Sequence, residues 1–391
     1  MPGPIRTTLD TLASLRLTVA LFAMAMLLIF AGTLAQVHAG IWQVMADYFR
    51  TPIAWIDLQL FVPQQLVTVP GSFPFPGGYL LGGLLIVNLL AAHALRFKLS
   101  ARRLGIITLH LGIIVLLIGE FVTGLFAEEG LMTIHEGGHA RYAEDVREAE
   151  LVVMNPADAE VHDVVAVPER MLTTADEVVQ DDSLPFAIRM DQWLPNAQLF
   201  NVPEGTPTRA TRGAGTQIMA RPAPRAKGVD GADVDMPAAY VTLHKDGRPL
   251  GTWLLSSMIG ALQPVEVAGE TYHIGLRFKR TYKPYTLHLL EFTHERFVGT
   301  ERPRNFASRI RLVDPTRNEE REVLISMNNP LRYAGATFYQ SAYLENDAGT
   351  VLQVVRNPGW LLPYVACALI STGMLIHFGM RLWQFAGRAS R

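Results

Sequence analysis

Four long apolar segments constrain the fold of this chain more than any other feature of its sequence. They span residues 17–36, 77–95, 104–126 and 360–380. Each is close to the ~20 apolar residues with which an α-helix crosses the hydrocarbon of a bilayer. A helix also satisfies its own backbone hydrogen bonds, as a segment surrounded by lipid must. The sequence therefore predicts a polytopic α-helical membrane protein with four transmembrane helices.

The composition excludes two classes of function. The formal net charge is −2, and no long basic run stands out, so we expect no nucleic-acid partner. The single cysteine, Cys367, lies within the fourth apolar segment. One cysteine cannot form an internal disulfide, a thiol redox pair or a covalent c-type haem site, which excludes a thiol oxidoreductase.

The basic residues that flank the apolar segments predict the orientation of the chain. They fall on one side of the predicted bilayer: Arg6 and Arg16; Arg96, Lys98, Arg102 and Arg103; and Arg381, Arg388 and Arg391. The positive-inside rule then places both termini and the second loop in the cytoplasm. Because the first segment is longer than a signal-peptide core and three more follow, we expect it to remain as an anchor.

This orientation gives three domains. Residues 1–126 form a membrane domain with helices 1–3, and residues 359–391 form transmembrane helix 4 and a cytoplasmic tail. Residues 127–358, between helices 3 and 4, form a large extracytoplasmic domain. Within the first domain, residues 41–75 carry Trp and Tyr among prolines and polar residues, and we expect them to lie at the membrane interface.

The extracytoplasmic domain is predicted to be β-rich. Residues 272–279 alternate apolar and polar side chains, which is the period of a strand with one wet face. The Lys-Asp-Gly sequence at 245–247 predicts a hairpin turn between two strands. Residues 201–237 are rich in Pro, Gly, Ala and Thr and predict a long loop or a partly disordered insertion. Further strands are expected at 285–291, 309–313, 323–326, 337–343 and 351–355.

Residues 135–139, His-Glu-Gly-Gly-His, match the letters of the zinc-protease motif. That chemistry needs both histidines one turn apart on a helix, with the glutamate acting on a zinc-bound water. Two adjacent glycines disfavour a helix, and the residues before them favour a strand. We therefore interpret the segment as a turn that follows a strand.

Three histidines lie inside the apolar segments: His93, His110 and His377. Imidazole is costly to bury in hydrocarbon, so an intramembrane histidine indicates a functional site. In the predicted orientation all three lie toward the cytoplasmic side, which suggests a shared site. The alternative is that His93 and His377, close to the boundary, reach into the interface and bind nothing.

Helical periodicity predicts which way these histidines face. Gly82 and His93 fall on one stripe of the second segment, so His93 should face protein. In the third segment Gly105, Gly112 and Gly119 form a close-packing ridge, and His110 points to the opposite side. The side chain of Asn88 is expected to form helix-to-helix hydrogen bonds. Glu120 lies toward the outer end of its segment, where we expect a protonated or interfacial carboxyl.

Haem is the ligand that best suits imidazoles in an apolar helix bundle. Its macrocycle is apolar and its iron accepts axial histidines from neighbouring helices. His110 and His93 are the candidate iron ligands, with His377 as a third residue of the haem site. Zinc or a proton relay would require further polar ligands at that depth, and none is evident in the sequence.

Several motifs in order along the chain resemble the ResB (CcsB) family of cytochrome c biogenesis proteins. The resemblance covers most of the chain and is weakest at 201–237. The motifs that carry it are residues 15–19 leading to residues 32–36, the run from His110-Leu111-Gly112 to Gly119, the Glu136-Gly137 turn, residues 327–331, residues 335–340, and Pro358-Gly359-Trp360 at the start of the last apolar segment.

The resemblance implies one subunit of the system II haem lyase of the bacterial inner membrane, with the large domain in the periplasm. A CcsA (ResC) partner would present haem b, carried transiently as cargo, for covalent attachment to apocytochrome c. The family's transmembrane haem histidine carries over to His110. The subunit itself would be non-catalytic or co-catalytic. The alternatives are a haem b electron-transfer subunit and a cofactor-free membrane-anchored scaffold.

Overall fold

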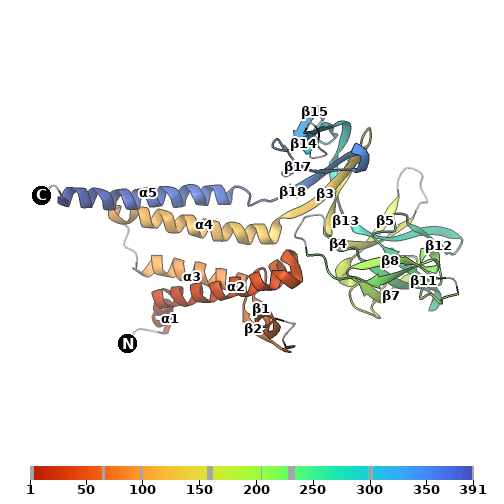
Figure 1. Ribbon diagram of the computed structural model, residues 1–391, viewed down its shortest axis with the longest axis horizontal. Helices are drawn as coiled ribbons and strands as arrows, with labels where there is room; N and C mark the ends of the chain where they lie inside the picture. Colours follow the sequence, from red (N-terminus) through yellow and green to blue (C-terminus); the bar gives the residue numbers. More distant parts are fainter. Residues whose placement is uncertain are drawn as a thin grey trace. The chain divides into compact units, whose positions relative to one another are not determined.

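The computed structural model describes residues 4–63, 67–96, 100–155, 162–203, 205–227, 234–297, 299 and 303–389. Lys98 and Arg391, two of the basic residues used to orient the chain, lie outside these ranges. The chain divides into two compact units. One contains residues 1–128 and 356–391 and is helical, and the other contains residues 129–355 and is built of strands (Figure 1).

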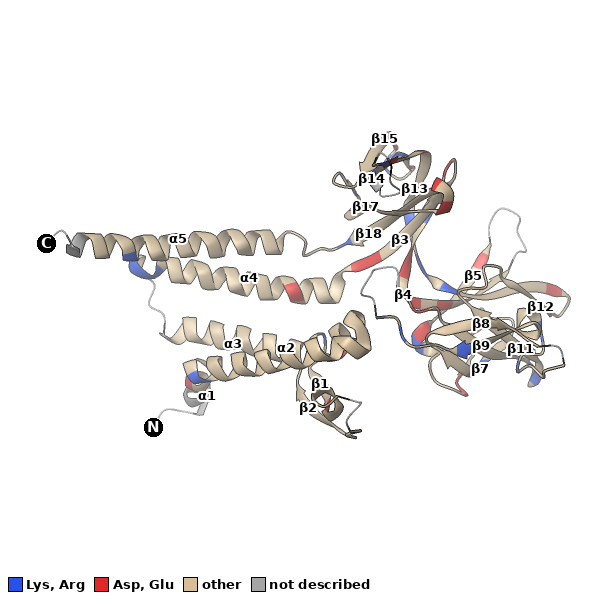
Figure 2. Ribbon diagram, viewed as in Figure 1, with Lys and Arg blue, Asp and Glu red and all other residues tan. Residues whose placement is uncertain are grey.

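The helical unit contains the four predicted apolar helices. Its helices are α1 (Pro4–Leu12), α2 (Leu15–Val44), α3 (Gly78–Arg96), α4 (Leu104–Phe126) and α5 (Leu362–Ala389). Helices α2 to α5 are each long and apolar enough to cross a membrane. Figure 2 shows few charged residues along these four helices, whereas the strands of the other unit carry many. The four apolar helices and the β-rich region before the last of them are therefore as predicted.

Two helices extend beyond their apolar segments. Helix α2 begins after Ser14, whose Oγ accepts a hydrogen bond from the backbone N of Arg16, and it continues past residue 36 to Val44. Within it Gly40 has a φ of 76°, which bends the chain. Helix α5 likewise continues to Ala389. Hydropathy marks the part of a helix that suits lipid, whereas caps and glycines determine where the helix ends.

Residues 41–75 form more regular structure than an interfacial segment requires. A turn of π-helix, η1 (Met45–Phe49), follows α2, and the 3-10 helix η2 (Leu58–Phe61) joins strands β1 (Ile53–Asp57) and β2 (Ser72–Pro76). The two strands pair antiparallel. On β1 the buried Ala54 and Ile56 alternate with exposed Ile53 and Trp55, as expected for a strand with one covered face.

Asn88 joins α3 to the junction of α1 and α2. Its side chain is buried, and its Nδ2 donates to the backbone oxygens of Leu12 at 2.5 Å and Ser14 at 3.2 Å. Its Oδ1 accepts from Thr18 Oγ1 at 2.7 Å. The predicted helix-to-helix role of Asn88 is confirmed, because this amide bonds the Leu12 carbonyl at the end of α1 and also Ser14 and Thr18 at the start of α2.

Helices α4 and α5 lie side by side (Figure 1) because of glycines on both. A Cβ on Gly105 would lie 2.6 Å from the backbone N of His377, and a Cβ on Gly373 would lie 2.5 Å from the backbone N of Leu109. Gly112 and Gly119 also face α5. The ridge of glycines predicted for this helix is therefore confirmed as a close helix contact.

The β-rich unit contains a large sheet and a smaller one. The larger sheet has the order β15-β14-β13-β4-β3-β18-β17-β16, with β12 paired to β13 and β5 to β4. The smaller sheet has the order β11-β10-β7-β6, and β8 pairs with β9. The bounds are β3 (Glu128–His135), β4 (His139–Asn155), β5 (Asp163–Pro168), β6 (Val178–Val179), β7 (Ala187–Leu194), β8 (Ala197–Asn201), β9 (Ile218–Pro222), β10 (Ala238–Lys245), β11 (Arg248–Ser256), β12 (Gln263–Val267), β13 (Glu270–Arg296), β14 (Pro303–Asp314), β15 (Glu319–Ser326), β16 (Leu331–Tyr333), β17 (Ala336–Tyr343) and β18 (Gly349–Arg356).

Strand β13 contributes to two hydrophobic cores. Its first half places Ile274 and Leu276 in a core shared with β7, β10 and β11. Its second half places Leu287 and Leu289 in a core shared with β14, β17 and β18. The period-2 alternation predicted for residues 272–279 is confirmed, since the buried apolar side chains recur at every second position.

The two predicted turns are also present. Asp246 and Gly247 have φ values of 49° and 73° and connect β10 to β11, which is the left-handed pair that a tight hairpin requires. The His-Glu-Gly-Gly-His segment joins β3 to β4, with Gly137 at a φ of 75°. Because His135 and His139 stand at the ends of two strands, they do not form the helical zinc motif.

The segment 201–237 differs from a long loop. It contains the 3-10 helix η5 (Gly213–Thr216) and strand β9, which pairs with β8. Packing explains this, because Ile218 and Ala220 lie against a core that includes Tyr240 and Leu254. Composition alone did not reveal that contact. Residues 204 and 228–233 lie outside the described ranges.

Candidate functional site

Two of the three predicted histidines meet between helices α3 and α4. The Nδ1 of His110 lies 3.1 Å from the Nε2 of His93. The two rings stand at 85° with their centroids 4.9 Å apart, and both side chains are half-buried. As predicted, His93 faces protein and His110 lies away from the glycine ridge of α4.

The hydrogen bonds of this pair define an order of donors and acceptors. The Nδ1 of His93 lies 2.8 Å from the backbone oxygen of Leu89, and since a carbonyl only accepts, Nδ1 carries the proton. In a neutral ring the Nε2 of His93 is then an acceptor, so the Nδ1–H of His110 donates to it. In that tautomer of a neutral His110 the Nε2 carries no proton, so it is the nitrogen that a metal would use.

The facing nitrogens of the pair have the spacing of a hydrogen bond. An imidazole nitrogen binds a metal at about 2 Å, so two nitrogens on opposite sides of one ion are roughly 4 Å apart. The separation of 3.1 Å between His110 Nδ1 and His93 Nε2 is shorter than this. The geometry matches a ligand histidine whose other nitrogen is held by a second residue.

His377 lies on α5, against the opposite face of α4. Its backbone N and Cα approach Gly105, and its ring lies edge-on to Phe378 with the centroids 5.5 Å apart. Sequence position suggested that all three histidines share a site. The structure brings His93 and His110 together and places His377 across α4, where the glycine ridge packs.

Sequence reasoning missed a cavity farther along α4. It has a volume of about 440 Å³ and is lined mainly by apolar side chains of η1, α3 and α4, with Arg50 and Glu120 as its charged residues. Glu120 lies ten residues after His110, or about 15 Å along the helix. Arg50 Nη2 lies 4.0 Å from Glu120 Oε1. Only tertiary packing brings Arg50 to this helix.

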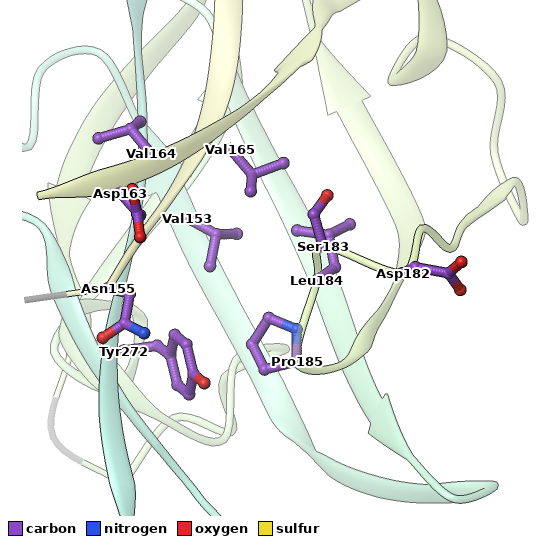
Figure 3. A pocket seen from close by; sticks show the side chains of 10 residues that line it. All are labelled: Val153, Asn155, Asp163, Val164, Val165, Asp182, Ser183, Leu184, Pro185 and Tyr272. Carbon is purple, nitrogen blue, oxygen red and sulfur yellow. The ribbon is translucent and has the colours of Figure 1, made fainter. Parts of the chain in front are cut away.

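A second cavity lies in the β-rich unit. It measures about 450 Å³ and is lined by β4, β5, residues 182–185 and Tyr272 (Figure 3). Valines 153, 164 and 165 form one part of its wall, and Asp163 and Asp182 are its two carboxylates.

Comparisons with known proteins show which sequences this chain is similar to. Residues 261–352 match the ResB-like family; they run from β12 to within β18. Protein NrfI of Wolinella succinogenes is 25% identical over 298 residues, which cover 75% of this chain and 29% of NrfI. The chain thus spans less than a third of the length of that relative. By its motifs, by the match of residues 261–352 and by this similarity, the chain is similar to proteins of the ResB-like family.

Proposed function

We propose that this chain is a membrane subunit of a cytochrome c biogenesis complex. It helps to move haem from the cytoplasmic side outward and presents apocytochrome c for covalent haem attachment, together with a CcsA (ResC)-type partner. The match of residues 261–352 to the ResB-like family and the similarity to NrfI support the assignment to cytochrome c biogenesis. The observation that carries the haem proposal is the hydrogen-bonded pair of His93 and His110 within an apolar helix bundle.

Haem suits this pair because the porphyrin itself supplies four of the iron ligands. One imidazole nitrogen that carries no proton is enough to bind the iron, and the apolar macrocycle is compatible with the surrounding helices. We assign the iron-ligand role to His110 Nε2 and the orienting role to His93, whose ring holds the other nitrogen of His110. The second axial ligand would come from the partner.

The location proposed for the complex is the bacterial cytoplasmic membrane, with both termini in the cytoplasm. Arg102 and Arg103 precede α4, and Glu128 and Glu129 follow it. This asymmetry supports a cytoplasmic start of α4 under the positive-inside rule. The β-rich unit would then be periplasmic, where apocytochrome c receives its haem.

Strand β5 is the edge at which we propose that apocytochrome c binds. Among the described strands β5 pairs with β4 alone, so its other edge offers backbone donors and acceptors to an extended peptide. The cavity of Figure 3 borders this strand through Asp163, Val164 and Val165. It would receive side chains of the bound peptide.

The test is to measure haem in the complex purified with its partner and to follow cytochrome c maturation in cells. We expect His110→Ala to lower the haem content and to halt maturation. Normal maturation with unchanged haem would reject the site.

Two other outcomes would support the alternatives. A stable, reversible b-type spectrum in the isolated chain would favour a haem b electron-transfer subunit. A complete, active complex without haem would favour a cofactor-free scaffold. His377→Ala is the matched control, because it removes an imidazole from the other side of α4.

A further inference from the structure

The β-rich unit contains a buried imidazole that the proposed function does not use. His294 lies on β13, and its side chain is 2% exposed. Its Nδ1 lies 2.7 Å from Asp347 Oδ1. Its Nε2 is buried and has no hydrogen-bond partner among the described residues. A buried polar atom without a partner is costly, so its retention requires an explanation.

Asp347 is held in place for this contact. Asn346 and Asp347 both have a φ of 57°, a backbone conformation that residues other than glycine rarely adopt. Arg296 Nη2 lies 3.3 Å from the second carboxylate oxygen, Oδ2. The carboxylate therefore accepts from Nδ1–H of a neutral His294, and the lone pair of the ring is left on Nε2. This is the arrangement in which proteins orient a histidine that binds a metal.

Aromatic rings surround this imidazole. The centroid of Tyr343 lies 4.4 Å from that of His294, and those of Phe306 and Phe292 lie at 6.3 and 6.5 Å. Tyr343 is 36% exposed and stands at the end of β17, after an irregularity in the pairing of that strand. Of the three rings it is the nearest to the imidazole and the most exposed. Tyr343 is therefore the side chain whose movement would be required to expose the buried His294.

A bare metal ion does not fit this position. Within the described part of the chain, no three His, Cys, Asp or Glu side chains are grouped to hold an ion, whereas a stable zinc site needs three or four protein ligands. Haem brings four nitrogen ligands of its own and needs from the protein one oriented imidazole and a flat apolar surface. Arg296, 43% exposed beside the pair, is placed to meet a carboxylate of the same ligand.

We propose that His294 Nε2 is an axial ligand for haem iron, reached when the ring of Tyr343 moves aside. The β-rich unit then has a haem site of its own, apart from the site on α3 and α4. This inference rests on the proposed function in so far as haem is the cargo of the chain. It does not depend on which transmembrane histidine binds haem.

The experiment uses the full chain in detergent with His93, His110 and His377 all replaced by alanine. Ferric haem is added, and the Soret absorption is titrated. We expect one haem per chain with a histidine-ligated spectrum. His294→Phe, which keeps an aromatic ring in the packed position, should weaken binding at least tenfold. His294→Gly should regain the spectrum when free imidazole is supplied, and Tyr343→Ala should bind haem faster.

His288→Ala is the matched control, since it removes a histidine from the same strand without touching Asp347. Equal binding by the His294→Phe chain and its parent would overturn the proposal, as would a folded triple-alanine chain that binds no haem. Failure of the proposed function is a separate result, because it appears as normal cytochrome maturation in the His110→Ala complex.

Discussion

Gly112 of α4 lies so close to α5 that a Cβ at this position would be 2.9 Å from the backbone oxygen of Ala366. Backbone atoms cannot turn aside as a side chain can, so any larger residue at 112 must push the helices apart. The α4–α5 contact thus requires glycine for its size, and the left-handed conformation that glycine also permits is not needed here.

We predict that Gly112→Leu destabilises the helical unit by about 1–3 kcal/mol, the usual effect of overpacking a close contact. The expected result is a lower thermal midpoint of the full chain in detergent, measured by circular dichroism. Gly379→Leu on α5 is the control, because a Cβ there meets nothing within 4 Å. Equal midpoints for the two variants would show that the glycine contact does not limit stability.

Asn88→Leu should loosen the junction of α1, α2 and α3. The substitution leaves the carbonyls of Leu12 and Ser14 and the hydroxyl of Thr18 without the side chain that now bonds them. The Ser14 carbonyl and the Thr18 hydroxyl still bond each other. The expected cost is about 1–3 kcal/mol, because the part-buried Leu12 carbonyl loses the amide that bonds it. Faster proteolysis of the N-terminal segment would report it.

Thr33→Val is the matched control for this junction, since among the residues that the structure describes the Thr33 hydroxyl bonds within its own helix, to the backbone oxygen of Ile29. Unchanged proteolysis of Asn88→Leu would mean that α1 is held by other contacts.

His93→Leu should weaken haem binding by about 10–100-fold, the usual effect of removing the residue that orients a metal ligand. His110→Ala should remove binding at this site altogether. The measurement is a haem titration of the full chain with its partner, followed by the Soret band. A His93→Leu chain that loses haem as completely as His110→Ala would make His93 a ligand in its own right.

Asp314 should make the β-rich unit sensitive to acid. The hydrogen bond from the Thr316 hydroxyl holds the pKa of this carboxyl below its usual range, against the opposing effect of burial. Tyr333 also donates to it, at 2.8 Å. Since the folded pKa is lower than the unfolded value of about 3.9, the stabilisation is present above that value and is lost as the pH falls through the folded pKa.

We therefore expect Asp314→Asn to lower the urea midpoint at pH 7 and to reduce the further fall of that midpoint below a pH of about 4. Near-ultraviolet circular dichroism of the full chain provides the readout. Glu322→Gln, an exposed carboxyl on β15, removes the same charge and should leave the acid dependence as it is. A wild-type midpoint that stays constant down to pH 2 would contradict the prediction.

Much of this molecule could be predicted from local pattern. Apolar length located four helices, because the number of residues that cross a bilayer is determined by its thickness. Alternation located β13, and the Asp246-Gly247 turn could be identified because few sequences tolerate two left-handed residues. The spacing of Gly105, Gly112 and Gly119 predicted a close helix contact without naming its partner.

Tertiary structure decided what the local pattern left open. The histidines at 93, 110 and 377 looked equivalent in sequence, yet two form a hydrogen-bonded pair and the third packs across α4. The contact of His294 with Asp347 joins residues 53 positions apart. Periodicity describes which face of one helix or strand a residue occupies. Which element packs against that face depends on segments distant in sequence, and only the folded chain determines their packing.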